Sequence, residues 1–503
     1  EFGVKGMILQ NVIYPDEVCG VDTMFFRTDG VIELQKKRIC LQPGNLLKTN
    51  TYMNILDRGY WEKYTIAKHF YIDFRAGGNF IFRIKHMSGT QRSKIIFEQK
   101  YENLENEIFH IQIPYLYKDG LIFWEIEAVS ETIFYEAAYS VQEPNEIKDV
   151  RLAINICTFH RNEQLNRNLK KFSESYFFRN EMPMYGKLRI YVIDNGMDFE
   201  SSYASEWIQI FREDNSGGGT GGFTRGLQEI ETAREIFQNT HTVFMDDDVE
   251  FQMESFYRLY VFLSLIKDKY KNTPVAGRMF RLDNRSIQYT AVERWNHGDI
   301  IHVSGNSDMS LEQGVIEEKD IIGDYGGWWF CVYPSEITSK NRPFPFFIHC
   351  DDVEYGLRQG EKTIILRGVQ VWHETYEYRI NPTITYYDIR NSLVVNAVYE
   401  QSLDKDMLIR QWKDRLDAFH NAGDETSEFL CTLAMWDFCI GKIFLKQKGK
   451  LSDFSLHMSK RSKFVKFIFP FFHRITEKMI SVNYHRILKF YRQKIKEEVW
   501  QFK

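Results

Sequence analysis

The sequence is poor in cysteine and proline. Its 503 residues include only 7 Cys and 11 Pro. The cysteines are odd in number, scattered and without a CxxC pair, which argues against a disulfide framework and against a structural zinc site. With so few prolines and 31 Gly, the chain has no room for a large low-complexity region. This cysteine content fits a reducing cytosol best.

Export and membrane-spanning signals are also missing. No charged-then-apolar leader opens the sequence, and its apolar stretches fall short of the roughly 20 residues that cross a bilayer. We therefore expect a cytoplasmic protein without a membrane span.

Basic charge is scarce along most of the chain and concentrated in its tail. The formal net charge is −5, yet residues 442–503 hold 16 Lys and Arg against 4 Asp and Glu. Within the tail, residues 460–472 and 484–502 mix cations with large apolar side chains. Such segments suit peripheral contact with an anionic membrane surface. The alternative is that the rings pack on the rest of the protein and the cations are merely solvated, and the sequence leaves both open. We expect no nucleic-acid partner.

Aromatic residues are abundant, at 16% of the chain. Up to about residue 145 they alternate with polar residues, which is typical of β-strands. Two pairs of such runs, 70–74 with 80–84 and 111–115 with 122–126, flank glycine-containing bends at 75–79 and 118–120 and predict hairpins. We expect an antiparallel, jelly-roll-like β-sandwich over residues 1–145, ending at a polar, proline-containing break.

From residue 146 to about 385 the pattern changes to that of an α/β domain. Short apolar strands at 152–156, 188–193 and 242–245 alternate with helical periodicity, including a helix over 256–266. This order predicts a mostly parallel sheet. Polar residues follow each strand, at 158–161, 194–196 and 246–248, where such sheets bind ligands. Residues 386–503 read as a helical region, with helices near 387–398 and 407–419.

Three consecutive carboxylates, Asp246, Asp247 and Asp248, end the third strand. They would repel one another unless a cation neutralised them. Because alternate residues of an extended segment project to the same side, Asp246 and Asp248 can face one divalent ion while Asp247 points elsewhere. A solvated acidic turn is the plain alternative.

A glycine-rich segment over residues 215–226 precedes a helix that we expect from about Leu227. Glycine permits close backbone approach to a ligand, and a helix N-terminus with Arg225 favours an anion. The segment is neither a P-loop nor a convincing dinucleotide fingerprint. A mobile linker is an equally good interpretation of the segment by itself.

Three further motifs carry chemistry. Asp351 and Asp352 open an apparent helix, where a carboxylate can act as general base or simply as an N-cap. His373 follows Val371 and Trp372 at a strand end, as a metal ligand or a structural histidine. Trp328 and Trp329 follow two glycines and can stack on a sugar or pack in the core.

Together these motifs resemble, in order and spacing, the metal-dependent inverting glycosyltransferases of GT-A family two. The segments 158–161, 215–226, 246–248, 328–329, 351–358 and 371–373 are most similar to bacterial galactofuranosyltransferases of that family. The resemblance implies a Rossmann-like GT-A catalytic domain behind an N-terminal β-sandwich. It covers about residues 1–400, with specific motifs between about 155 and 395.

The resemblance also implies roles for particular residues. Asp352 would be the catalytic base, and Asp246, Asp248 and His373 would bind Mn²⁺ or Mg²⁺. The remaining implied roles are binding of the uridine diphosphate sugar, by Thr158, Phe159, Arg161, Asp194, Asn215, Arg225 and Asp247, and binding of the acceptor, by Trp328, Trp329, Asp351 and Tyr376. Two positions depart from the family pattern: Asp388 stands in place of a histidine, and Tyr376 in place of a tryptophan.

The implied reaction is transfer of galactofuranose from UDP-galactofuranose, with inversion, to a glycan or lipid-linked acceptor in bacterial cell-wall polysaccharide synthesis at the inner membrane face. A family-two transferase with a pyranosyl or rhamnosyl donor is the alternative within enzymes, and a non-catalytic glycan-binding protein is the alternative outside them. A homo-oligomer stays open.

Overall fold

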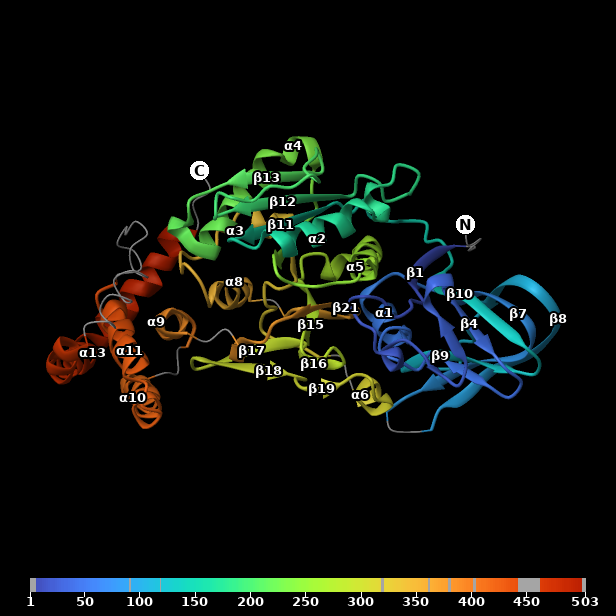
Figure 1. The fold of residues 1–503 in the computed structure, drawn as a ribbon. Helices are drawn as coiled ribbons and strands as arrows, with labels where there is room; N and C mark the ends of the chain where they lie inside the picture. The colour runs from blue at the N-terminus through green and yellow to red at the C-terminus, as the bar shows by residue number, and fades with distance from the viewer. Residues whose placement is uncertain are drawn as a thin grey trace.

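The computed structural model describes residues 6–89, 92–117, 119–317, 321–360, 362–378, 381–400, 404–441 and 462–499. Three parts follow one another along the molecule in Figure 1: a strand-rich N-terminal part in blue, a central sheet with helices, and a group of C-terminal helices in orange and red.

The N-terminal part is a ten-stranded sheet in which every described pairing is antiparallel. Its strands are β1 Met7–Asn11, β2 Arg27–Thr28, β3 Val31–Glu33, β4 Arg38–Leu41, β5 Leu46–Lys48, β6 Leu56–Asp57, β7 Phe70–Met87, β8 Lys94–Gln112, β9 Leu121–Ala128 and β10 Thr132–Val141. Helix α1, Arg58–Tyr64, follows β6. The expected antiparallel strands are confirmed, and the two-layer sandwich stays a prediction.

Both expected hairpins are wrong. Residues 70–87 form the single strand β7, which pairs with β10 over its first half and with β9 over its second. The register shifts on either side of Gly78, whose φ is +112°. A Cβ atom on Gly78 would lie 2.3 Å from the Glu131 carbonyl oxygen. The glycines thus permit a bulge inside the strand rather than a turn that ends it. Strands β8 and β9 likewise each pair with β7 and not with each other.

The central part contains a nine-stranded sheet in the order β13-β12-β11-β14-β20-β15-β16-β19, with β21 paired to β15. Its strands are β11 Leu152–Thr158, β12 Leu188–Asp194, β13 Ile208–Arg212, β14 His241–Asp246, β15 Val275–Arg281, β16 Ile287–Thr290, β19 Ser307–Asp308, β20 Cys331–Pro334 and β21 Ile364–His373. The three predicted strands are confirmed as β11, β12 and β14, and they pair in parallel. The sheet as a whole is mixed, because β20 runs antiparallel to β14 and β15.

Helices flank this sheet, and a separate hairpin lies beside it (Figure 1). The helices are α2 Asn162–Ser173, α3 Gly218–Thr232, α4 Arg234–Phe237, α5 Met253–Leu265, α6 Glu312–Glu317, α7 Ser335–Thr338 and α8 Asp351–Gln359. The predicted helix over 256–266 is confirmed as α5. The hairpin consists of β17 Val292–Asn296 and β18 Asp299–Val303.

One hydrophobic core runs from the N-terminal sheet into the central sheet. Strand β10 ends at Val141 and strand β11 begins at Leu152, so the domain boundary predicted near residue 145 lies between them. A buried ion pair between Arg258 and Glu254 of α5 adds polar contacts at this junction. Glu254 accepts hydrogen bonds from the backbone and side chain of Asn11 at 2.7 and 2.9 Å, and Arg258 donates to the Met53 carbonyl oxygen at 2.9 Å. The two parts are therefore packed together rather than joined loosely.

The C-terminal part consists of α9 Pro382–Tyr399, α10 Lys405–Asn421, α11 Glu425–Cys439 and α13 Ser462–Val499. Asn381, Asp404 and Asp424 cap the first three through side-chain oxygens that accept a backbone N–H. The inner side chains of α13 belong to the helical core, namely Ile480, Tyr484, Ile487, Leu488, Tyr491 and Ile495. For these residues the packing alternative is correct. Residues 442–461 and 500–503 of the predicted basic tail lie outside the described part.

None of the described helices combines the length and hydrophobicity needed to cross a lipid bilayer.

Candidate functional site

Asp246, Asp248 and His373 come together at one edge of the central sheet. Asp246 ends β14 and His373 ends β21. The His373 Nε2 atom lies 3.0 Å from Asp248 Oδ1 and 3.5 Å from Asp246 Oδ2. One ligand atom from each residue lies within 4.8 Å of the others. The three residues predicted to bind a metal are thus close enough to share one ion.

The chemistry of this donor set fits a divalent cation such as Mn²⁺ or Mg²⁺. It offers hard carboxylate oxygens and one imidazole nitrogen, which Mn²⁺ accepts readily. The Arg161 guanidinium contacts Asp248 and lies 3.3 Å from Asp247 Oδ1. A positive charge therefore already offsets the carboxylates at this edge.

Asp247 has a different environment from its neighbours. It is buried, and its Oδ2 accepts a 2.7 Å hydrogen bond from the Thr158 hydroxyl at the end of β11. Burial raises the pKa of Asp247 to about 6, the Asp248 charge adds to the rise, and Arg161 opposes it. This contact ties the ends of β11 and β14 together, so Asp247 supports the site.

The other predicted nucleotide-binding residues fall into two groups. Asp194, Phe159 and Asn215 lie in or beside the segments that follow strands β11 to β13. The buried Asp194 carboxylate accepts the backbone N–H groups of Gly196 and Phe199, at 3.0 and 2.8 Å, and so shapes the loop after β12. Phe159 is 48% exposed. Arg225 of α3 instead forms two ion pairs, with Glu229 of the same helix and with Glu213, which precedes it.

The glycine-rich segment is helical, which corrects the expected helix start near Leu227. Helix α3 begins at Gly218. A Cβ atom on Gly222 would lie 2.2 Å from Cys157 Sγ, and one on Gly226 would lie 1.9 Å from Asn155 Oδ1. These glycines are therefore required by the close packing of α3 on β11, a reason that the sequence pattern does not reveal.

The first turn of α3 contacts the segment that carries the predicted base. The Thr220 hydroxyl donates to Asp351 Oδ2 at 2.8 Å, and the Thr220 N–H donates to the Phe347 carbonyl oxygen at 3.1 Å. The structure therefore joins two motifs that are more than a hundred residues apart in the sequence.

Asp351 and Asp352 are the first two residues of α8, as predicted. Burial raises the pKa of both carboxyl groups. The neighbouring charges of Asp351 and then Glu293 raise the pKa of Asp352 further. A carboxylate with raised proton affinity is a better general base near neutral pH than an ordinary one.

The backbone before α8 is strained. Phe347, His349 and Cys350 have φ values of +79°, +64° and +63°. Such conformations cost on the order of 1 kcal/mol each for residues other than glycine. The Asn391 side-chain amide of α9 donates to the carbonyl oxygens of Ile348 and His349, at 2.8 and 2.9 Å. The sequence pattern gave no role to Asn391, because the burial of its amide is visible only in the structure.

The three aromatic residues predicted to bind the acceptor differ in burial: Trp328 is buried, whereas Trp329 and Tyr376 are partly exposed. Trp328 is 4% exposed and stacks on Phe244 with ring centroids 4.3 Å apart, as the core-packing alternative describes. Trp329 is only partly buried, and its Nε1 donates to the Gly277 carbonyl oxygen at 3.3 Å. Tyr376 lies edge-on to His349, with ring centroids 5.6 Å apart.

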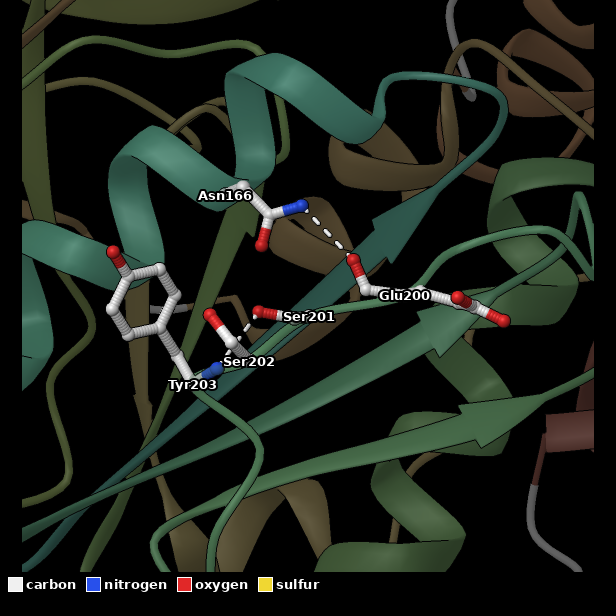
Figure 2. Close-up of a pocket in the computed structure, with 5 residues that line it drawn as sticks. All are labelled: Asn166, Glu200, Ser201, Ser202 and Tyr203. Carbon is white, nitrogen blue, oxygen red and sulfur yellow. Dashed lines mark hydrogen bonds between the residues drawn. The ribbon is translucent and has the colours of Figure 1, made fainter.

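An open surface pocket of about 560 Å³ is lined by Asn166 of α2 and by residues 200–203, which follow β12. Figure 2 shows the Asn166 side chain reaching toward the Glu200 carbonyl oxygen, to which its Nδ2 donates at 3.0 Å. No residue predicted from the sequence lines this pocket.

Comparison with characterised proteins identifies galactofuranosyltransferases as relatives. The chain is 23% identical over 383 residues to "Galactofuranosyltransferase GlfT2" of Mycobacterium tuberculosis, covering 69% of this chain and 58% of that protein. It is 28% identical over 203 residues to the protein of the same name from Mycolicibacterium smegmatis, covering 36% and 30%. The chain thus spans less than two thirds of these relatives. The similarity supports a glycosyltransferase that resembles galactofuranosyltransferases.

No protein-family model matches the chain. Among solved structures, the STIV protein A197 is 14% identical and covers 45% of this chain and 87% of its own, with a TM-score of 0.25. A family 6 carbohydrate-binding module is 10% identical, covering 23% and 82%, with a TM-score of 0.16. These scores are too low to carry an argument about fold or function.

Replacing Asn391 by Ala should reduce sugar transfer about tenfold or more while the binding of a nucleotide diphosphate persists. The reason is that the strained segment before Asp352 loses the amide that holds its carbonyl groups, each bond contributing about 1 kcal/mol. Steady-state turnover and calorimetry with UDP would measure the two effects. Asn396→Ala is the matched control, because it removes another buried side-chain amide of α9, whose Oδ1 accepts from Trp295 Nε1 at 2.9 Å. Equal turnover in both variants would contradict the positioning role.

Proposed function

We propose that this protein is an inverting, metal-dependent glycosyltransferase of the GT-A type. Its donor would be UDP-galactofuranose and its acceptor a glycan, lipid-linked or free, in cell-wall polysaccharide synthesis. Support for the transferase class comes from the similarity to galactofuranosyltransferases. Support for the chemistry comes from one observation: Asp246, Asp248 and His373 converge at one edge of the central sheet, and the charge of Asp246 acts on Asp351, the neighbour of the proposed base.

In this proposal Asp246, Asp248 and His373 hold the divalent ion, which would stabilise the negative charge of the departing diphosphate. Arg161 adds a second positive charge at the same edge. Asp352 takes the proton from the acceptor hydroxyl as that oxygen attacks the anomeric carbon. The proton ends on the carboxyl group, the glycosidic bond to the diphosphate breaks, and a single displacement inverts the anomeric centre.

The neighbouring residues would orient the acceptor and exclude water. Asp351 is fixed by the Thr220 hydroxyl, so it is already positioned to accept a hydrogen bond from a sugar. Trp329 and Tyr376 are only partly buried, which leaves ring surface for a sugar to stack on. Trp328 lies in the aromatic core and would act only by supporting Trp329.

The donor and the base can be tested together. Among UDP-galactofuranose, UDP-galactopyranose, UDP-glucose and dTDP-rhamnose, only the first should release its nucleotide diphosphate faster when a galactofuranose disaccharide is added. Asp352→Asn should abolish that increase and leave calorimetric binding of UDP with Mn²⁺ close to wild type, because the amide keeps the shape but accepts no proton.

Transfer by Asp352→Asn at more than about a hundredth of the normal rate, within the usual range for loss of a general base, would remove Asp352 as the base. Asp351→Asn is the matched control, and it should retain more activity than Asp352→Asn.

Metal dependence gives a second prediction. Excess chelator should stop transfer and Mn²⁺ should restore it. Asp246→Ala, Asp248→Ala and His373→Ala should each weaken Mn²⁺-assisted UDP binding about tenfold or more, since they would share one ion. Calorimetry with and without Mn²⁺ separates this effect from nucleotide binding by itself. Asp194→Ala removes a carboxylate outside the cluster. In this variant, Mn²⁺ should increase the affinity for UDP as much as it does in the wild type. Full activity in chelator would contradict a metal centre.

We also propose that helix α13 contacts a membrane surface peripherally. On α13, the outward side chains alternate between apolar and basic, namely Phe471, Arg474, Ile475, Lys478, Val482, Arg486 and Lys489. Phe471 and Val482 are 67% and 72% exposed. This face suits an anionic bilayer surface, into which the apolar side chains would insert.

The double substitution of Phe471 and Val482 by Ser should lower co-sedimentation with phosphatidylglycerol vesicles several-fold, while phosphatidylcholine vesicles pellet little of either protein. Ile236→Ser is the matched control, because Ile236 is 77% exposed on α4. Truncation before α13 is unsuitable, since its inner side chains complete the helical core. Unchanged pelleting would locate any membrane contact elsewhere.

A further inference from the structure

The β17–β18 hairpin carries a buried carboxylate next to the segment that supports α8. Glu293, the second residue of β17, is 3% exposed. Its backbone pairs with Tyr325: the Glu293 N–H donates to the Tyr325 carbonyl oxygen at 3.2 Å, and the Glu293 carbonyl oxygen accepts from the Asp324 N–H at 2.8 Å. The hairpin is thereby attached to residues 324–325.

Glu293 forms an ion pair with a histidine that solvent can reach. His302 of β18 lies directly opposite Glu293 in the hairpin, and its Nδ1 is 2.8 Å from Glu293 Oε1. The Glu293 side chain is 4% exposed and that of His302 is 36% exposed. The hydrogen bond to Glu293 raises the pKa of His302. A buried carboxylate without such a partner would lower the stability of the folded protein.

Tyr325 connects this ion pair to the predicted base. A Cβ atom on Gly356 of α8 would lie 2.3 Å from Tyr325 Cβ, so α8 rests directly on Tyr325 at the fifth residue after Asp351. Burial and then the charges of Glu293 and Asp352 raise the pKa of Tyr325, so both carboxylates act on this tyrosine. The Glu293 charge likewise raises the pKa of Asp352.

We propose that the Glu293–His302 ion pair sets the charge state of Asp352: the buried Glu293 carboxylate keeps Asp352 basic, and the solvent-exposed imidazolium of His302 limits how much negative charge reaches it. This inference rests on the proposed function, because it assumes that Asp352 is the base. It adds a solvent-accessible control of the base that acts through electrostatics and touches no substrate.

Other charged and titratable groups also act on these two positions. His302 faces Glu293 and, more weakly, Glu377, and its ring lies 4.8 Å from that of Tyr289. Asp352 is surrounded by the acids Asp351, Glu293 and Asp246, and its charge also acts on the thiols of Cys331 and Cys350 and on Tyr325. Of the two hairpin groups, Glu293 is negative and His302 can be positive, so in this proposal they act on Asp352 with opposite signs. The proposed ion on Asp246 and the Arg161 guanidinium are the same in wild type and in both variants, and they do not change the direction of the expected shifts.

The two halves of the pair give opposite shifts in the pH profile of kcat/KM, measured with UDP-galactofuranose, Mn²⁺ and a galactofuranose disaccharide. The acidic limb reports loss of the proton from the base. Glu293→Gln removes a negative charge, so the limb should move to lower pH by about half a unit. His302→Gln removes the cation that is present below the pKa of His302, so the limb should move to higher pH by a similar amount.

The control is His297→Asn, which removes a second histidine of the same hairpin. His297 Nδ1 lies 3.3 Å from Glu400 Oε2, so this histidine is paired with a carboxylate other than Glu293. The acidic limb of the kcat/KM profile of His297→Asn should stay at the pH of the wild type. Thermal unfolding verifies that each variant is folded, and His302→Gln decides the sign by itself if Glu293→Gln does not fold.

Limbs that stay in place, or that move in the same direction in both variants, overturn the inference. A rate loss at every pH with an unmoved limb does so too. These results leave the proposed function intact as long as Asp352→Asn is inactive, whereas an active Asp352→Asn removes the proposed base itself.

Discussion

Repulsion among carboxylates at one edge of the central sheet is the constraint on which the site depends. Asp246, Asp247, Asp248, Asp351 and Asp352 gather there. Like charges in a partly buried region are tolerated only beside cations, donors or helix N-termini. Arg161 contacts two of the acids, the Thr158 and Thr220 hydroxyls donate to two, and α8 begins at the last pair. The guanidinium, the two hydroxyls and the N-terminus of α8 each offset part of the negative charge of these carboxylates. A divalent ion would offset more of it.

The second requirement is rigid support for Asp352, the proposed base. Asp352 follows three residues in left-handed backbone conformations, which persist only where the surroundings hold them. The hydrogen bonds from Asn391 on one side and from Thr220 on the other provide that support. The C-terminal helices are therefore part of the site's framework, because α9 supplies Asn391 while α11 and α13 pack against α9.

Much of the local structure follows from sequence pattern. Apolar runs bounded by polar residues indicated β11, β12 and β14, and amphipathic spacing indicated α5. The failures have physical causes. Gly77 and Gly78 look like a turn, but they form a bulge in β7, since a bulge and a turn require the same conformational freedom. The glycines of α3 look like a loop because their reason, contact with Cys157 and Asn155, lies in another segment.

The sequence pattern indicated the candidates for chemistry, namely the acids after β14, the acids that open α8 and the histidine that ends β21, with a structural alternative open for each. It could do so because strand ends and helix starts are local features, and carboxylates there need a compensating charge. The surroundings of the candidates come from the tertiary structure: Trp328 is buried, Arg225 is engaged by Glu213 and Glu229, and Glu293 pairs with His302 in a hairpin bridged to Tyr325. Burial and charge pairing depend on residues distant in the chain, which no local pattern encodes.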